Sequence, residues 1–447
     1  MSTPRTVRTT RSGAAHRLAA LVEDALGGPL PVRLRAWDGS ETGPAGGPVV
    51  VVRSRRALRR LLWRPDELGV AQAYVTGELD VDGDLAGGLR ALWAAAREHD
   101  LHPPRLTLAD RTRALRTAVR LGAVGPRPAD PASQARLRGG LHSKARDRAA
   151  ISHHYDLSND FYRLLLDDTM AYSCGYWPGG EPGGTTDEGP GVTAERSQRA
   201  KLELICRKLG LVPGARLLDI GCGWGSLTLY AAEEHGAQVT AVTLAREQAA
   251  HVRARVRERG LERRVDVVCR DYRDVGGGAY DAVAAVEMGE HVGDAEYPAF
   301  TAALHRLLRP GGRVLVQQMS RGATAPGGGA FIESFIAPDM HMRPLGETVT
   351  LLEGAGLEVR SVESLREHYV RTVAAWHRTL EDRWSDAVRL VGEQRARVWR
   401  LYLVGGALAF EQRRMGVDQI LSVRPTADGA SGMPATPAQW YAGPERP

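Results

Sequence analysis

The sequence predicts an α/β protein in which a small α+β amino-terminal domain precedes a Rossmann-like, mostly parallel sheet. The first observation is a strand, a tight glycine turn and a helix: Leu217 to Ile220 is apolar, Gly221 to Gly225 reads GCGWG, and Ser226 to His235 has helical apolar spacing. The second is that strands and helices keep alternating afterwards, as in doubly wound sheets. The later segments are strand Gln238 to Val242, helix Arg246 to Gly260, strand Val265 to Cys269, strand Tyr280 to Val286, helix Tyr297 to Leu308 and strand Arg313 to Met319.

The glycine turn predicts a nucleotide-like ligand at the carboxyl edge of the sheet. Backbone N–H groups and a helix N-terminus meet there, and glycines allow a ligand to approach the backbone. The spacing differs from the dinucleotide fingerprint, and no Asp or Glu follows the second strand in the usual place. A close packing turn is the alternative interpretation. The turn resembles motif I of class I S-adenosylmethionine (SAM) methyltransferases, in which the preceding acidic residue, here Asp219, supports the loop that holds the methionine part of SAM.

The length of the chain and its Pro- and Gly-rich stretches predict the domain boundaries. At 447 residues the chain is too long for one compact core. The amino-terminal domain mixes short helices and strands and carries no cluster of chemically active side chains. The expected segments are a disordered tail over residues 1–16, the amino-terminal α+β domain over 17–123, a basic linker over 124–148, the catalytic domain over 149–423 and a second disordered tail over 424–447.

The overall composition is that of an ordinary soluble globular protein, with 25% charged and 43% hydrophobic residues. No apolar run approaches the ~20 residues that a membrane-spanning helix needs. The amino end also lacks the apolar core of a secretory signal. Four cysteines, Cys174, Cys206, Cys222 and Cys269, show no metal-ligand spacing. We therefore expect a cytoplasmic protein with reduced thiols and no metal site.

A basic region from Arg105 to Arg148 predicts contact with phosphate groups. Leu115, Val119 and Leu121 give part of it an amphipathic character, and no aromatic residue is interleaved for base stacking. Anionic lipid head groups at the inner face of the membrane are therefore favoured over nucleic acid, and a solvated helix with a linker is the alternative. The basic residues include Arg111, Arg113, Arg116, Arg120, Arg127, Arg136, Arg138, Lys144 and Arg146.

Several further motifs, in the same order along the chain, together resemble the cyclopropane-fatty-acid synthase family, which includes mycolic acid cyclopropane synthases and fatty-acid C-methyltransferases. The resemblance covers roughly Ala149 to Gln419 and implies a seven-stranded SAM-binding domain. The segment Arg33 to Leu85 is similar to actinobacterial members of the tuberculostearic acid route, which place a methyl or methylene branch on oleoyl lipids. The motifs are HYDLSNDFY at His154 to Tyr162, Tyr172-Ser173-Cys174, LLDIGCGWG, Val242-Thr243-Leu244 with Gln248, Gly289-Glu290-His291-Val292-Gly293, Leu308-Arg309-Pro310-Gly311-Gly312, and Glu367-His368-Tyr369 with Trp376.

This resemblance implies an unsaturated acyl chain, on a phospholipid, as the substrate. An isolated alkene attacks the sulfonium methyl of SAM and leaves a carbocation, which must be shielded from water before it loses a proton. The site therefore needs a dry apolar channel, aromatic faces and a base. The alternatives are a methyltransferase for a non-lipid small molecule and a non-catalytic lipid-binding protein on the same fold.

The resemblance also implies the site residues. In the family, the positions that match Cys174, Glu290 and Tyr369 line a bicarbonate that serves as the base, and His291 and Gln317 complete the expected catalytic set. Ordinary packing or capping is the alternative for each of them. The expected SAM contacts are Tyr172, Ser173, Asp219, Gly221, Gly223 and Gly225, with Thr243 and Gln248 in place of an acidic ribose partner and Asp271 and Tyr272 beside the adenine.

One departure from the family changes the expected product. Cyclopropane synthases carry His-x-Ile on the strand after the Pro-Gly-Gly turn, where this chain has Gln317 and Met319. An amide cannot titrate, so bicarbonate binding is in doubt. Together with the amino-terminal resemblance, this favours a 10-methylene chain, which a separate reductase would saturate, over a cyclopropane ring.

The remaining expectations concern the acyl channel. Phe331, Ile332, Phe335 and Ile336 are expected to border its mouth, and the helices between Ser364 and Gln419 to form a lid and wall. The sequence does not decide whether the chain forms a homo-oligomer.

Overall fold

The computed structural model describes residues 13–26, 28–45, 48–98, 107–135, 159–179, 193–276, 279–322 and 328–441. These residues form two compact units, one of residues 1–134 with 393–405 and one of 135–392 with 406–447. Residues 1–12 of the expected tail, 136–148 of the expected linker and His154 to Ser158 of the HYDLSNDFY motif lie outside the described residues, as do Arg105, Arg136, Arg138, Lys144 and Arg146 of the basic region.

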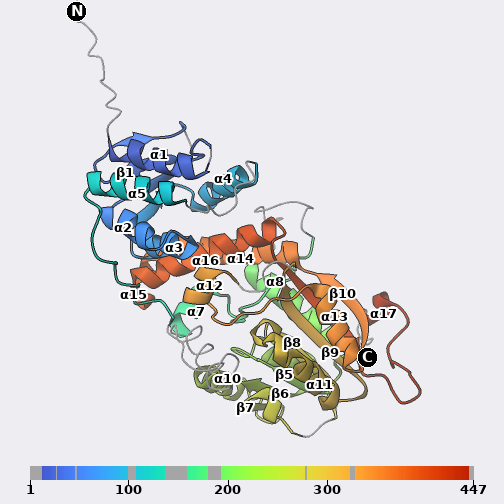
Figure 1. The fold of residues 1–447 in the computed structure, drawn as a ribbon. Helices are drawn as coiled ribbons and strands as arrows, with labels where there is room; N and C mark the ends of the chain where they lie inside the picture. Colours follow the sequence, from blue (N-terminus) through green and yellow to red (C-terminus); the bar gives the residue numbers. More distant parts are fainter. Residues whose placement is uncertain are drawn as a thin grey trace, which may run out of the picture. The chain divides into compact units, whose positions relative to one another are not determined.

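The first unit is a small α+β domain (Figure 1). Its four-stranded sheet has the order β2-β1-β3-β4. Its buried side chains include Leu34, Val52 and Leu58. The expected disorder through residue 16 is wrong at its end, because α1 begins at Ala14, which is buried. The elements are α1 (Ala14–Leu26), β1 (Arg33–Ala36), β2 (Glu41–Thr42), β3 (Val49–Val52), α2 (Arg55–Trp63), α3 (Glu67–Val75), β4 (Leu79–Asp82), α4 (Leu85–Glu98) and α5 (Leu108–Arg120).

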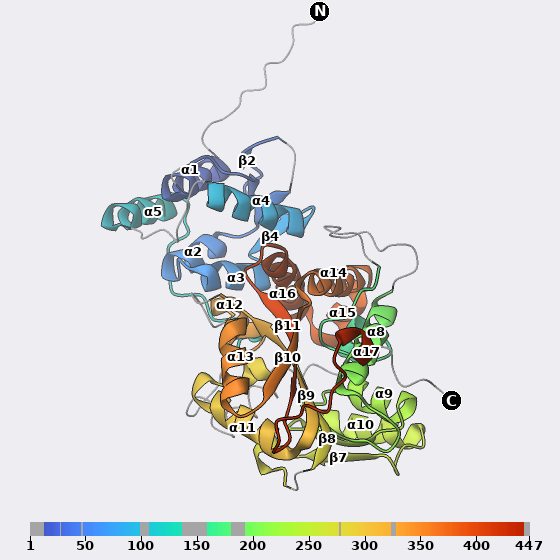
Figure 2. The same cartoon turned by 90° about the vertical axis from the view of Figure 1, so that its right-hand side faces the viewer.

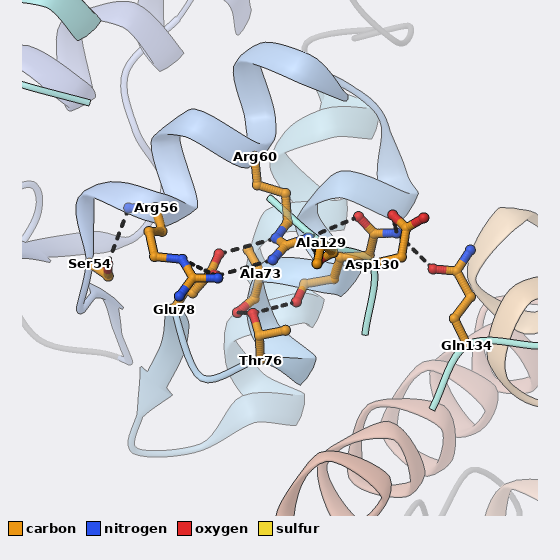
Figure 3. Close-up of polar contacts among 10 residues, drawn as sticks. Ser54, Arg56, Arg60, Ala73, Thr76, Glu78, Ala129, Asp130 and Gln134 are labelled. Carbon is orange, nitrogen blue, oxygen red and sulfur yellow. Dashed lines mark hydrogen bonds and ion pairs between the residues drawn. The ribbon is translucent and has the colours of Figure 1, made fainter. Parts of the chain in front are cut away.

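Arg60 on α2 forms a buried ion pair and also binds the segment expected to be a linker. Arg60 is only 2% exposed and donates from Nε and Nη2 to the carboxylate of Glu78, with both distances 3.1 Å (Figure 3). Its Nη1 donates to the carbonyl oxygen of Ala129 at 3.1 Å. Gln72 Nε2 donates to Gln134 Oε1 at 2.8 Å. Hydrogen bonds therefore hold residues 129–134 against the first unit.

The second unit is built on a seven-stranded sheet of order β10-β11-β9-β8-β5-β6-β7 (Figures 1 and 2). The strands from β9 to β7 in this order run parallel, and β11 lies antiparallel between β9 and β10. The predicted mostly parallel sheet is confirmed. The strands are β5 (Arg216–Ile220), β6 (Gln238–Thr243), β7 (Val265–Cys269), β8 (Tyr280–Val286), β9 (Leu308–Ser320), β10 (Glu358–Ser364) and β11 (Gly416–Val423).

Helices cover both faces of this sheet. Leu202, Leu227 and Val252, from α8 (Ala194–Leu209), α9 (Ser226–Glu234) and α10 (Arg246–Glu258), pack in one apolar cluster with β5 to β8. Phe300 and Leu352, from α11 (Tyr297–Leu307) and α13 (Leu345–Gly354), pack in the cluster on the other face. Because both faces are covered, β5 and β8 are apolar along nearly their whole length.

The carboxyl-terminal part differs from the prediction in two ways. The helices α14 (Arg366–Asp382), α15 (Trp384–Val391) and α16 (Glu393–Glu411) fit the expected helical segment, but the chain then returns to the sheet as β11. Beyond it, residues 424–441 are described, and the short helix α17 (Pro437–Tyr441) buries Trp440, whose Nε1 donates to the carbonyl oxygen of Pro434 at 2.7 Å. The expected disorder from residue 424 is therefore wrong for these residues.

Candidate active site

A cavity lies at the carboxyl ends of β5, β6 and β8 and encloses about 840 Å³, including its open mouth. The carboxyl ends of neighbouring parallel strands are the usual ligand site of an open α/β sheet. Six of the expected SAM contacts line it together. They are Gly221, Gly223, Thr243, Gln248, Asp271 and Tyr272.

The glycine turn forms one wall of the cavity with backbone that only glycine adopts easily. Gly221, Gly223 and Gly225 have φ of +78°, +55° and +87°. A Cβ on Gly221 would come within 2.9 Å of Met288, whereas a Cβ on Gly223 would meet no protein atom within 4 Å. Gly223 therefore leaves space for a ligand, while Gly221 leaves space for a neighbouring side chain.

Asp219 supports the turn from beneath. It is buried, and its Oδ2 accepts a hydrogen bond from Thr228 Oγ1 at 2.7 Å. Burial raises the pKa of Asp219 to about 6, although Thr228 and the buried Lys201 oppose the shift. Asp219 does not line the cavity, and its side chain instead binds the helix that follows the glycine turn.

The opposite wall carries the expected ribose partners. Thr243 Oγ1 donates to Gln248 Oε1 at 2.9 Å, which orients the amide. Gln248 Nε2 is buried and makes no hydrogen bond within the described part of the chain. A buried donor without an acceptor is costly, and the hydroxyl groups of a ribose would supply acceptors. The donor set and the space at Gly223 both fit SAM.

Asp271 and Tyr272 follow β7 and line the same cavity. Arg273 already engages the Asp271 carboxylate, with Nη2 to Oδ2 at 2.6 Å and Nε to Oδ1 at 2.8 Å. Tyr272 packs edge-on against Phe300, with ring centroids 5.4 Å apart. A flat group would therefore meet a fixed carboxylate and a fixed ring at this end of the cavity.

Tyr172 and Ser173 are not among the residues that line the cavity. Ser173 is buried, and its Oγ accepts a hydrogen bond from Lys201 Nζ at 2.8 Å. The Tyr172 ring lies 5.3 Å from the Trp376 ring and 5.7 Å from the Tyr162 ring, centroid to centroid. This segment therefore belongs to an aromatic group beside the cavity.

Glu287 occupies the centre of the remaining expected catalytic residues. It follows β8 directly, has a left-handed backbone (φ +52°) and lines the cavity. Its Oε1 accepts from the backbone N–H of Cys174 at 2.7 Å and from Gln317 Nε2 at 2.8 Å. Its Oε2 accepts from the Tyr369 hydroxyl at 2.6 Å. Three of the expected catalytic positions thus converge on a carboxylate that belongs to the protein.

Burial and the neighbouring groups have opposite effects on the pKa of Glu287. Burial raises its pKa, while the bonds from Tyr369, Cys174 and Gln317 and the nearby Lys201 oppose the rise. Burial in turn lowers the pKa of the Lys201 ammonium, with Glu287 as the first opposing charge. Burial also raises the pKa of the Cys174 thiol well above its usual value, so this thiol is neutral and only the Cys174 backbone contacts the carboxylate.

Glu290 has a different environment. It is 1% exposed, and neither carboxylate oxygen makes a well-formed hydrogen bond to a described residue, although the N–H groups of Glu290 and Met319 lie close enough to favour its charge. Burial, with the Glu287 charge second, raises its pKa well above the usual value. Burial lowers the pKa of the cavity-lining His291 to about 4, so this imidazole is neutral.

Sequence reasoning missed Glu287, Lys201 and Lys208. Glu287 follows the central strand β8 directly, a position where side chains meet ligands in open α/β sheets, so its place in the sequence could have found it. Lys201 and Lys208 lie on α8 at helical spacing and carried no local signal, because burial of an ammonium depends on contacts far along the chain.

A family model described as mycolic acid cyclopropane synthetase matches residues 142–420. The chain belongs to this family. The chain is similar to a probable fatty acid methyltransferase from Pseudomonas putida. The two are 36% identical over 428 residues, which cover 92% of this chain and 96% of the relative. The chain is also similar to the tuberculostearic acid methyltransferase UfaA1 of Mycobacterium tuberculosis, with 32% identity over 412 residues, 88% of each chain.

Solved structures of the mycolic acid cyclopropane synthetase family share the fold. The complex of CmaA1 with SAH and CTAB is 30% identical, with a TM-score of 0.56 over 62% of this chain and 97% of that one. The expected fold class, a SAM-dependent methyltransferase with an additional amino-terminal domain, is thereby confirmed. The protein is a SAM-dependent methyltransferase that acts on the fatty acyl chains of lipids. When bound, SAM supplies an electrophilic methyl group on a sulfonium sulfur. No helix within the described ranges is both long and apolar enough to cross a bilayer.

Proposed function

We propose that this methyltransferase places a one-carbon branch on the double bond of an unsaturated acyl chain, such as the oleoyl chain of a phospholipid, and forms a 10-methylene product. One observation carries the proposal: three donors from separate segments hold the Glu287 carboxylate at the wall of the cofactor cavity. Such a carboxylate can accept the proton that the reaction releases, without bicarbonate. A separate reductase would saturate the methylene.

The proposed reaction begins with the alkene. Its π electrons form a bond to the methyl carbon while the bond from that carbon to sulfur breaks, and the electrons of the broken bond remain on sulfur. The neighbouring acyl carbon then carries a positive charge. The rings of Tyr369 and Trp376, with centroids 6.2 Å apart, offer faces that tolerate this charge and exclude water.

The hydrogen bonds of Glu287 favour the methylene product because they make it a weaker base than a buried carboxylate without them would be, although burial keeps its pKa above the usual value. Each of its three hydrogen bonds stabilises the charged carboxylate and so lowers the affinity of this carboxylate for a proton. Slow proton removal gives a hydride time to move from the methylated carbon to its neighbour, which leaves the charge on a carbon with three carbon substituents. Glu287 then takes a proton from the transferred methyl, and the electrons of that C–H bond form the exocyclic double bond.

The product of purified protein, SAM and oleoyl phospholipid deuterated at both alkene carbons tests this directly. We expect a chain heavier by one CH2, with the NMR signals of a terminal methylene. Both deuterons should lie on one carbon beside the branch, because the hydride shift moves one of them there.

A cyclopropane ring is the second candidate, and the description of the matching family supports it. In that reaction the C–H electrons of the methyl group close onto the cation before any shift. One deuteron on each ring carbon would therefore contradict the methylene proposal and support the ring.

The helix α5 is proposed to contact the lipid surface. Leu108, Leu115 and Val119 lie on one face at helical spacing and are 81%, 51% and 62% exposed, while Ala118, about a quarter of a turn away around the helix, is buried. Exposed arginines flank this apolar stripe, which is the pattern of a helix lying in an anionic bilayer interface. They are Arg111, Arg116 and Arg120.

Replacing both Leu115 and Val119 with Ser should weaken binding to vesicles of phosphatidylcholine with phosphatidylglycerol about thirtyfold or more, because burying two such side chains contributes ~2 kcal/mol or more. Cosedimentation at low and high salt measures this. Val70→Ser is a matched control, since Val70 is 47% exposed on α3 of the same unit. If the control weakens binding equally, or if the paired substitution has no effect, α5 is not the contact.

A further inference from the structure

A row of buried polar side chains crosses the sheet and ends at Glu287. Gln419 on β11 pairs in register with Gln317 on β9 and with Glu363 on β10. Gln419 and Gln317 are 1% and 0% exposed. Lys208, in the last turn of α8 and 1% exposed, closes the row from outside the sheet. The mechanism proposed above uses only the last members of this row.

The contacts run in one direction. Lys208 Nζ donates to Gln419 Oε1 at 2.7 Å and to Glu363 Oε2 at 2.5 Å. Gln419 Nε2 donates to Gln317 Oε1 at 2.9 Å. Gln317 Nε2 then donates to Glu287 Oε1 at 2.8 Å. Every amide thus presents its oxygen towards Lys208 and its NH2 group towards Glu287.

This direction follows from the chemistry of Lys208. An ammonium has three donors and no acceptor, so Gln419 must turn its oxygen towards it. The NH2 group of Gln419 then faces Gln317. Gln317 must therefore accept with its amide oxygen, and its own NH2 group points to Glu287. A flipped Gln317 would place an amide oxygen against the Glu287 oxygen, a contact that only a protonated carboxyl could make.

We propose that Lys208 is a positioning residue that acts through Gln419 and Gln317 to hold the acceptor face of Glu287 ready for the substrate proton. The proposal rests on the function proposed above only in taking Glu287 as the base. Other groups also face Glu287: Lys201 from α8, Tyr369 from α14, the Cys174 thiol and Glu290. These groups stay in place when Lys208 is replaced.

Lys208→Met, which keeps the length of the side chain and removes its donors, is the first test. The amides can then flip and Glu287 binds a proton more readily, so the acid limb of the kcat–pH profile should move upward by about one unit. That is about a tenfold loss on the limb, with recovery at high pH. Gln419→Leu should shift the limb equally, and the double variant should shift it no further, because both act through one amide. Glu363→Gln, which still offers an oxygen to Lys208, should leave the profile unchanged.

Infrared difference spectra against Glu287→Gln give a readout that needs no turnover. The Glu287 band should change from carboxylate to protonated acid at a higher pH in Lys208→Met than in the wild type. If this band shifts while no acyl lipid is converted, the proposed function fails and the positioning role of Lys208 stands. An unshifted band, an equal loss of kcat at every pH, a matching shift in Glu363→Gln, or a shift in Lys208→Met without one in Gln419→Leu would each overturn the proposal.

Discussion

Replacing Glu287 with Gln should lower kcat about a thousandfold, within the ~10²–10⁴ range that a positioned general base contributes. The amide has nearly the same size as the carboxylate but cannot accept the substrate proton. Two of the three groups that bind this position, the Cys174 N–H and the Gln317 NH2 group, donate to it, so the NH2 group of the amide could only face the Tyr369 hydroxyl. The rate should be measured in single turnovers at saturating SAM, so that a change in cofactor affinity does not enter.

Glu290→Gln is the matched control for this experiment. Glu290 is buried, burial raises its pKa, and neither of its carboxylate oxygens accepts a well-formed hydrogen bond from a described residue, so a neutral amide should replace it with a far smaller loss of kcat. The two glutamates are three residues apart and both come from the turn after β8. If only Glu290→Gln is inactive, the base is Glu290 and not Glu287. Equal inactivity of the two variants would contradict the claim that Glu287 has a special role.

Gly223→Ala should weaken SAM binding about ten- to a hundredfold, because filling a packed space with an extra methyl costs ~1–3 kcal/mol. A Cβ at this position meets no protein atom within 4 Å and projects from a residue that lines the cavity. The steric conflict therefore arises with the ligand and not with the fold. Isothermal titration calorimetry with SAM measures the change.

Gly214→Ala separates this effect from backbone strain. Gly214 lies in the turn before β5, has φ of +83°, and a Cβ added to it would likewise meet no protein atom within 4 Å. Both variants lose about 1–2 kcal/mol of stability to the left-handed backbone, and only Gly223 faces the cofactor cavity. If Gly214→Ala weakens SAM binding as much as Gly223→Ala, the loss reflects strain, and the glycine turn has no special role in holding the cofactor.

The parallel core of the fold could be predicted because its signals are local. Strands β5 to β8 are short apolar runs separated by helical spacing and glycine or proline turns. Strands β10 and β11 could not be recognised in the same way. The segment of β11, Gly416–Val423, follows a long helix without a strong turn signal, and its partner β9 is about a hundred residues earlier in the chain.

The residues that line the cofactor cavity could also be predicted, whereas the residues around Glu287 could be predicted only in part. Gly223, Thr243 and Gln248 come from continuous motifs and meet at one cavity. Gln317 was expected to disturb an anion site, and its amide instead binds Glu287. That pairing joins residues thirty positions apart, and nothing near either residue indicates it. The two buried lysines of α8 depend in the same way on contacts that only the folded chain provides.

The dependence of turnover on bicarbonate tests the central claim, that the protein itself carries the base. In buffer free of carbon dioxide, the wild type should react equally fast with and without added bicarbonate. Glu287→Gly suits the left-handed backbone, with φ of +52°, and leaves the three donors facing a space of carboxylate size. This variant should be nearly inactive alone and recover with bicarbonate. A wild type that stops when bicarbonate is removed would contradict the claim, because the base would then be a bound anion and not Glu287.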